Sequence, residues 1–109
     1  MQDYESPDIP GEDVTLTANV LKAMAHPLRW KILCSLGDKE LSVGEIVERA
    51  GTSQSNISQH LEQLRNKNIV VSRRDANRIF YSVRNAEVLK LIGQMRTVLC
   101  RANLEDHYD

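Results

Sequence analysis

The 109-residue sequence lacks the signatures of several classes of protein. No apolar run approaches the roughly 20 residues of a membrane-spanning helix, and the acidic opening MQDYESPDIPGED is unlike a secretory or transit signal. We therefore expect a cytoplasmic protein with no membrane partner. The chain also has no C-x-x-C motif, no paired histidine base and no cofactor signature. We expect neither an enzyme nor a bound cofactor.

Charge is unevenly distributed, although the formal net charge is only −1. Residues 1–13 carry five acidic and no basic residues, whereas residues 53–84 carry six basic residues against two acidic ones. We expect residues 1–13 to form a flexible acidic tail, because proline, glycine and like charges there oppose a packed core. Residues 14–104 are predicted to form one folded domain, followed by a short tail at residues 105–109.

Residues 42–68 show the pattern of a helix-turn-helix, two short helices joined by a glycine-containing turn. Ser42 and Glu45 have the S-x-x-E spacing of a capping box, which predicts a helix start. Gly51 is predicted to end that helix, since glycine readily adopts the left-handed conformation found after helix C-termini. Ser53 is predicted to be the N-cap of the second helix.

The second helix of this pair is predicted to have one apolar and one polar side. Ile57, Leu61 and Leu64 recur at helical spacing and should face a core. Hydroxyls and carboxamides on the other side can hydrogen-bond base edges and phosphates in a DNA major groove. An ordinary surface helix with a polar outer face is the alternative, and His60 could equally serve packing. The candidate DNA-binding residues are Ser53, Gln54, Ser55, Asn56, Ser58, Gln59, His60 and Arg65.

Residues 69–83 are typical of a β-hairpin that turns at Asp75-Ala76-Asn77. Three arginines, Arg73, Arg74 and Arg78, are expected near its tip. A basic hairpin after a helix-turn-helix indicates a winged helix, whose wing contacts the phosphate backbone and releases counterions. The alternative is that these arginines serve only solubility.

Three further helices are predicted. One covers residues 14–25, and a second follows Pro27 and ends at Gly37. A long third helix is capped by Asn85, and its apolar stripe is wider than a small monomer can bury. We interpret the excess as a homodimer surface shared with the first helix, although the stripe could be entirely intramolecular. The expected fold is α+β, mainly α: a winged helix-turn-helix of about five helices and a two-stranded β wing.

The order of these elements resembles the ArsR/SmtB family of bacterial repressors. The likeness is carried by LKAMAHPLRWKILCSL (21–36), ELSVGEIVERAGTSQSNISQHLEQLRNKNIV (40–70) and RRDANRIFYSV (73–83). The resemblance implies a homodimer that represses transcription by binding double-stranded operator DNA and releases it when an inducer binds.

Both familiar metal sites of that family are missing here. Residues 41–44 contain no cysteine where some members have thiolate ligands, and residues 85–100 contain no Asp or His. Two isolated cysteines and three scattered histidines fall short of the three or four ligands that Zn²⁺ prefers. We expect no metal site. A metal-responsive repressor that uses Cys34, Cys100 and His107 is the alternative.

The placement of Cys34 and Cys100 resembles the dithiol, persulfide- and redox-sensing branch of the family. The resemblance implies that these two are sensor thiols, with reactive sulfur species or oxidants as inducer. Such a role requires the thiols to lie close together, at least one being partly exposed with a lowered pKa. Arg96, one helical turn before Cys100, could stabilise its thiolate. Alternatively both cysteines are structural, because free cysteines often behave as small buried hydrophobes.

Overall fold

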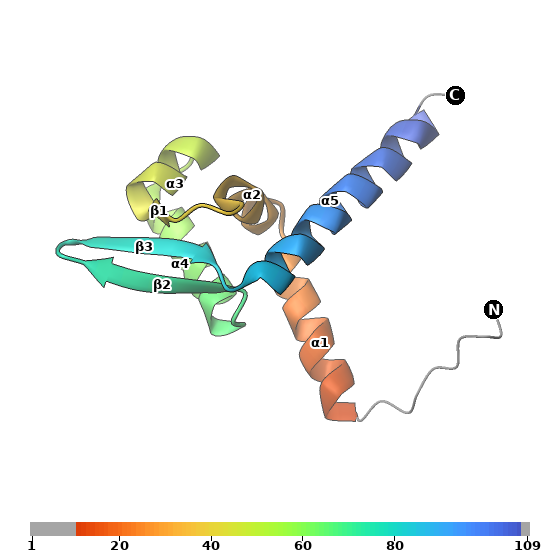
Figure 1. Cartoon of the computed structure of the whole chain (residues 1–109), viewed down its shortest axis with the longest axis horizontal. Helices are drawn as coiled ribbons and strands as arrows, with labels where there is room; N and C mark the ends of the chain where they lie inside the picture. Colours follow the sequence, from red (N-terminus) through yellow and green to blue (C-terminus); the bar gives the residue numbers. More distant parts are fainter. Residues whose placement is uncertain (1–10, 108–109) are drawn as a thin grey trace.

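The computed structural model describes the backbone of residues 11–107 and the side chains of residues 13–101. This part of the chain forms five helices and three strands, which confirms a mainly helical α+β winged helix (Figure 1). The elements are α1 (Gly11–Met24), α2 (Pro27–Leu36), β1 (Leu41–Ser42), α3 (Val43–Ala50), α4 (Gln54–Asn66), β2 (Val70–Asp75), β3 (Arg78–Val83) and α5 (Ala86–His107).

The sheet contains one strand more than the two-stranded wing that was predicted. Its antiparallel order is β1-β3-β2, and Leu41 and Ser42 of β1 pair with Tyr81 and Phe80 of β3. The hairpin itself turns between Asp75 and Arg78, as predicted. A strand of two residues has no period in the sequence, so only its pairing with β3 defines it.

Local side-chain chemistry sets the helix boundaries. Ser42 and Glu45 form the predicted capping box: Ser42 Oγ accepts from the Glu45 N–H at 3.2 Å, and Glu45 Oε1 accepts from the Ser42 N–H at 2.8 Å. Gly51 ends α3 with φ 75° and ψ 33°, and Asn85 Oδ1 accepts from the Val88 N–H at 2.9 Å. These observations confirm the predicted helix ends. Such ends can be predicted because hydrogen bonds between neighbours in the chain determine them.

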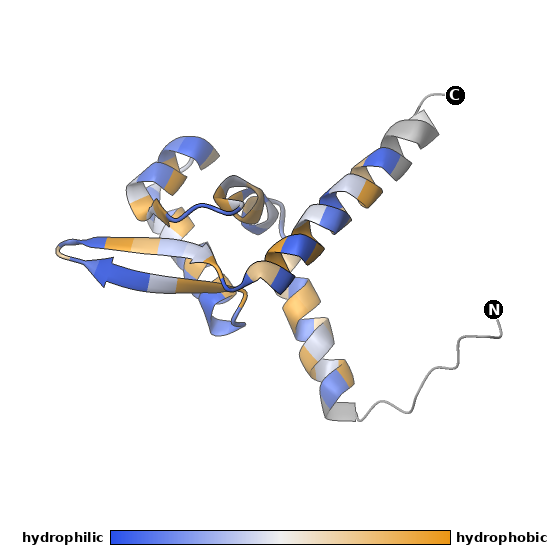
Figure 2. Cartoon of the chain, in the orientation of Figure 1, coloured by the Kyte–Doolittle hydropathy of each residue, from blue (hydrophilic) through white to orange (hydrophobic). Residues whose placement is uncertain are grey.

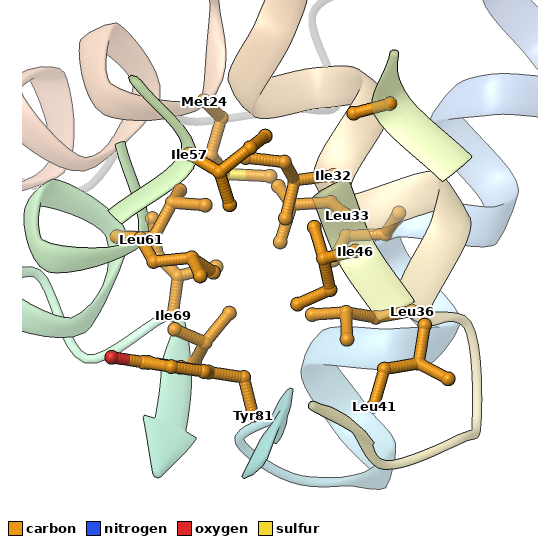
Figure 3. Packing of buried hydrophobic residues seen from close by; sticks show 14 of the residues in the cluster. Met24, Ile32, Leu33, Leu36, Leu41, Ile46, Ile57, Leu61, Ile69 and Tyr81 are labelled. Carbon is orange, nitrogen blue, oxygen red and sulfur yellow. The ribbon is translucent and has the colours of Figure 1, made fainter. Parts of the chain in front are cut away.

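The hydrophobic core forms where α2, α3 and α4 meet the sheet. Ile57 and Leu61 of α4 point toward Ile32 of α2 and Ile46 of α3 across the interior (Figure 3). All four are fully buried, at 0% exposure. Helix α2 packs against each of the other four helices and against β3, as its two apolar sides predict. Any shift of α2 must therefore be felt by the helix-turn-helix.

Helices α1 and α5 diverge from the end of the core opposite the wing tip (Figure 1). Helix α1 begins at Gly11, three residues before the domain start that was predicted. The acidic tail otherwise falls on residues 1–10, which lie outside the described residues, and α5 continues to His107. None of the helices in residues 11–107 has both the length and the apolar character needed to cross a bilayer.

Candidate nucleic-acid interface and thiol pair

Helix α4 presents an exposed polar side, opposite the buried Ile57, Leu61 and Leu64. That side carries carboxamide and hydroxyl groups, which donate and accept hydrogen bonds without bringing a charge. Water contacts these groups on the isolated chain, so nothing within the fold has to be displaced before a ligand reaches them. The exposed candidates are Gln54, Ser55, Ser58 and Gln59.

Two other candidates on this helix hold its first turn. Ser53 Oγ accepts a hydrogen bond of 3.2 Å from the Asn56 N–H, so Ser53 is the predicted N-cap. Asn56 Nδ2 donates to Thr52 Oγ1 at 3.2 Å. These bonds satisfy polar groups that a helix N-terminus leaves free. Ser53 and Asn56 thus orient the start of α4 through contacts within the chain.

His60 turns away from the exposed side of α4 and packs against α2. Its Nδ1 accepts a hydrogen bond of 3.0 Å from Arg29 Nε, and its ring lies 4.5 Å from that of His26, centroid to centroid. Burial, His26 and Arg29 together lower the pKa of His60. Of the two sequence-based alternatives for His60, packing is the one that this geometry supports.

The wing presents three arginines in three different environments. Arg73 makes a two-bond pair with Glu40, with Nε and Nη2 at 2.7 and 2.8 Å from the carboxylate oxygens. Arg78 Nη2 donates to Ser42 Oγ at 3.2 Å, and both guanidinium groups lie over the ring of Phe80. Arg74 is exposed on the other face of the hairpin, because its register partner is Ile79 rather than Phe80. Among the described residues, no ion pair or hydrogen bond engages the guanidinium of Arg74.

A groove of about 290 Å³ joins the wing to the start of α4. Gln54 of α4 and Arg78 of β3 both line it. Arg65, at the far end of α4, is exposed and paired with Glu62 at 2.6 Å. The structure thus places the predicted polar and basic candidates on α4, at its N-cap and on the wing, with His60 turned toward α2.

Exposed apolar side chains gather instead on the two diverging helices. Figure 2 shows hydrophobic segments along both α1 and α5, outside the core. Near the place where these helices meet α2 lies an apolar cavity of about 450 Å³, lined in part by Trp30 and Met95. Val71, on the wing, is the one large exposed hydrophobic residue in the described part of the chain that lies elsewhere. The others are Val14, Leu16, Leu21, Leu91, Val98 and Leu99, each more than half exposed.

Cys34 and Cys100 are both free thiols, the first half-buried on α2 and the second exposed on α5. They lie close enough for their charges to interact. Burial raises the pKa of Cys34, the charge of Arg96 opposes that rise, and a thiolate at Cys100 adds to it. The lowered pKa required of a sensor thiol is thus not found at Cys34, because desolvation outweighs the arginine. Arg96, expected beside Cys100, also acts on Cys34.

Within the described part of the chain, no three His, Cys, Asp or Glu side chains gather in a way that could hold a metal ion. The side chain of His107, part of the metal alternative, lies outside the described side chains.

Arg29 and Glu40 hold candidate residues in place, yet neither was identified from the sequence. Arg29 contacts a residue 31 positions away, and Glu40 one 33 positions away. Such pairs leave no periodic signal, since they arise only when the fold brings distant segments together. For Glu40, the one available hint was the excess of basic residues in the wing, which could attract an acidic side chain from elsewhere in the chain.

Comparison with known proteins adds the family. Residues 26–72 match the family described as bacterial regulatory protein, arsR family. Over 84 residues the chain is 45% identical to the transcriptional activator HlyU of Vibrio cholerae, covering 77% of this chain and 78% of that protein. Over 104 residues it is 36% identical to the biofilm growth-associated repressor of Xylella fastidiosa, covering 92% and 91%.

Solved structures agree with this match. A structure described as reduced HlyU from Vibrio cholerae has a TM-score of 0.73 and 40% identity, covering 82% of this chain and 94% of that one. The homodimeric winged helix-turn-helix DNA-binding domain of Mb0332 from Mycobacterium bovis has a TM-score of 0.79 and 25% identity, covering 96% and 98%. The named relatives are regulators of transcription rather than enzymes. This chain is therefore a member of the ArsR family of bacterial transcriptional regulators.

Proposed function

We propose that the protein is a homodimeric repressor that binds operator DNA through α4 and the wing, and releases it when Cys34 and Cys100 become covalently bridged. The observation that carries the proposal is that α2, with the half-buried Cys34, packs against both α4 and α5, and that the charge of the exposed Cys100 on α5 reaches Cys34. A regulator of this kind acts on the chromosome, so the proposed location is the cytoplasm.

The chemistry of α4 and the wing supports DNA as the partner. The exposed carboxamides of Gln54 and Gln59 each have one donor and one acceptor group. These can pair with the acceptor and the donor that adenine presents in the major groove. Ser55 and Ser58 lie on the same side and are suited to base edges or phosphates. The wing arginines and Arg65 supply the positive charge that phosphate binding requires. Ser53 and Asn56 contribute by fixing the first turn of α4.

The exposed apolar surfaces of α1 and α5 support a second copy of the chain as the other partner. Leu16 and Val98, on different helices, are each 61% exposed, and surfaces of this kind are normally covered by another protein. The similar domain of Mb0332 is described as homodimeric. A two-fold dimer would present one α4 helix to each half of a palindromic operator.

The different exposures of the thiols support an order of reaction. Cys100 is exposed and meets an electrophile first, whereas Cys34 is shielded and its pKa is raised. With an organic trisulfide RS–S–SR, the Cys100 thiolate attacks the central sulfur and displaces RS⁻. Cys34 then attacks the same central sulfur, displaces the second RS⁻ and completes a protein trisulfide. The two thiol protons end on the two RSH products.

Attack at an outer sulfur gives a simple disulfide instead. The Cys100 thiolate then displaces RSS⁻, and Cys34 attacks the Cys100 sulfur and displaces RS⁻, so the products are RSSH and RSH. A disulfide needs the two Cα atoms within roughly 4.4–6.8 Å, whereas an inserted sulfur relaxes that limit. In either case α2 becomes fixed to α5. Because specific binding requires both α4 helices at the half-site spacing, a small rotation of α2 weakens it.

Anisotropy titrations of a labelled duplex with the full-length protein test the proposal. The duplex is selected from a random library by the dithiol form, and dimethyl trisulfide is the reagent. We expect the reagent to weaken binding at least tenfold in the wild type, in line with typical coupling energies. Cys34→Ser and Cys100→Ser are expected to keep their affinity, since neither can form the bridge.

Ser35→Ala is the matched control, because it removes a side-chain oxygen beside Cys34 on α2 without touching a thiol. It should respond as the wild type does. Intact-mass spectrometry of the same samples should show loss of both thiol hydrogens, with or without one added sulfur. Release of DNA by both serine variants would refute the dithiol mechanism, while failure of the dithiol form to select any duplex would refute DNA binding itself.

A further inference from the structure

A cluster of three side chains ties α2 to α4, apart from both the DNA-facing residues and the thiol pair. Arg29 Nε donates to His60 Nδ1 at 3.0 Å, and the rings of His26 and His60 lie 4.5 Å apart. His26 Nδ1 accepts from the Leu28 N–H at 3.1 Å and so caps α2. Arg29 Nη1 also donates to the Ala23 carbonyl of α1 at 3.4 Å. Three helices therefore meet at this point, in the middle of α4.

The geometry of the cluster fixes the protonation state of His60. Its Nδ1 can accept from Arg29 only while that nitrogen keeps its lone pair, so the ring must be neutral with its proton on Nε2. Adding a proton to Nδ1 turns the acceptor into a donor that faces another donor. It also places a positive charge beside a guanidinium that is always charged. Protonation of His60 therefore breaks the link between α2 and α4.

No acidic group among the described residues acts on His60 to stabilise its protonated form. The charged or titratable groups that act on it are His26 and Arg29. Helix α1 contributes the Ala23 carbonyl, which accepts from Arg29. Within the described residues, α3 and β2, which pack on other sides of α4, add no charge that reaches the ring. On α4 itself, Glu62 is paired with Arg65.

We propose that His60 is a positioning residue for DNA binding: neutral His60, held by Arg29, orients α4, and mild acidification releases this hold and weakens binding to DNA. The inference rests on the proposed role of α4 as the recognition helix. It makes a prediction of opposite sign to direct contact, because a histidine that touched phosphate would bind more tightly once protonated.

Acidification is expected to lower the stability of the fold as well as the affinity for DNA. The pKa of His60 is lowered in the folded chain, so below the ordinary value of about 6.5 the unfolded chain takes up the proton first. The stability contributed by neutral His60 is complete above about pH 6.5 and is lost as the pH falls below it. The pH window from about 7.5 to 5.5 therefore tests both DNA binding and folding.

The experiment compares the full-length wild type with two asparagine variants at pH 7.5 and 5.5, at constant ionic strength. Binding to the selected duplex and the thermal unfolding midpoint are both measured, with the thiols kept reduced. His60→Asn retains an acceptor near the position of Nδ1 but cannot be protonated. His26→Asn is the matched control, since asparagine is also a good N-cap and removes the neighbouring imidazole.

We expect the affinity of the wild type to fall about two- to fivefold at pH 5.5, because the lowered pKa of His60 leaves the folded chain only partly protonated there. His60→Asn should lose less than twofold, and His26→Asn should keep most of the wild-type fall. Unchanged or tighter binding by the wild type at pH 5.5 would overturn the proposal, as would an equal fall in His60→Asn or no fall in His26→Asn. If no duplex is ever bound, the role of α4 fails, while the midpoints still decide whether His60 holds the helices together.

Discussion

The exposed side chains at the two ends of this molecule, α4 with the wing and α1 with α5, differ in chemistry. On α4 and the wing the exposed groups are carboxamides, hydroxyls and guanidinium groups, which water satisfies until a ligand arrives. On α1 and α5 the exposed groups include leucines and valines that water does not satisfy. The polar surface of α4 and the wing is stable in water without a partner. The apolar surface of α1 and α5 favours a partner that stays bound.

This difference separates specificity from assembly. In the proposed complex, hydrogen bonds from α4 discriminate between DNA sequences because an unmatched polar group is costly once buried. Apolar contacts along α1 and α5 are less selective in direction, yet each buried Å² adds about 25 cal/mol. Helix α2 joins the two ends, since it packs against α1, α4 and α5 alike. We therefore expect a covalent change at Cys34 of α2 to affect both ends.

The largest expected effect comes from charging the apolar end. Leu91→Glu, at a residue 52% exposed on α5, should produce monomers and weaken binding to a two-site duplex by a hundredfold or more, because one half-site contact no longer assists the other. Sedimentation and anisotropy measure the two effects. Val71→Glu is the control, since Val71 is an exposed apolar residue on β2 rather than on α1 or α5. Dissociation of the Val71→Glu protein as well, or a stable Leu91→Glu dimer, would remove the assembly role from α5.

Local chemistry made much of this division predictable from the sequence. Ser42 with Glu45, Gly51, Ser53 and Asn85 mark helix ends through bonds between neighbours in the chain, so their effect does not depend on the rest of the fold. The apolar excess on α5 was likewise visible as a stripe too wide to bury, which the exposed Leu91, Val98 and Leu99 confirm.

A middle-sized effect separates the two sides of α4. Gln59→Ala should weaken binding to the selected duplex about tenfold, with little change in folding, because an exposed carboxamide makes its bonds only to the bases. Leu61→Ala, at a fully buried position, should instead lower the free energy of unfolding by about 2–5 kcal/mol. Denaturant titration and anisotropy on both variants are the measurements. A Gln59→Ala protein with unaltered affinity would mean that this side of α4 does not read bases.

The smallest effect distinguishes the wing arginines. Arg74→Ala should weaken binding a few-fold and reduce the slope of log affinity against log salt by about one, as expected for one lost phosphate contact. Arg73→Ala should change the slope less, because Arg73 already pairs with Glu40 and must exchange one partner for another. Equal slopes for both variants and the wild type would show that the wing does not contact phosphate.

The features that could not be predicted from the sequence arise from contacts between residues that are far apart along the chain. Strand β1 exists only through its pairing with β3, and the position of His60 depends on Arg29, which lies 31 residues earlier. The pKa of Cys34 rises because the fold partly shields the thiol from water, a property that neighbouring residues in the sequence do not reveal. The family resemblance implied that these two thiols are sensors, whereas only the fold shows that Cys100 is the more exposed of the two.

The most direct test of the link between the two ends uses the bridged protein after it has been purified away from all reagent. Its affinity for the selected duplex is compared with that of the same sample after reduction by a phosphine. We predict binding at least tenfold weaker for the bridged protein, with full recovery once intact mass shows that both thiols have returned. Equal affinity before and after reduction, with the Cys34–Cys100 bridge verified by mass, would contradict the account.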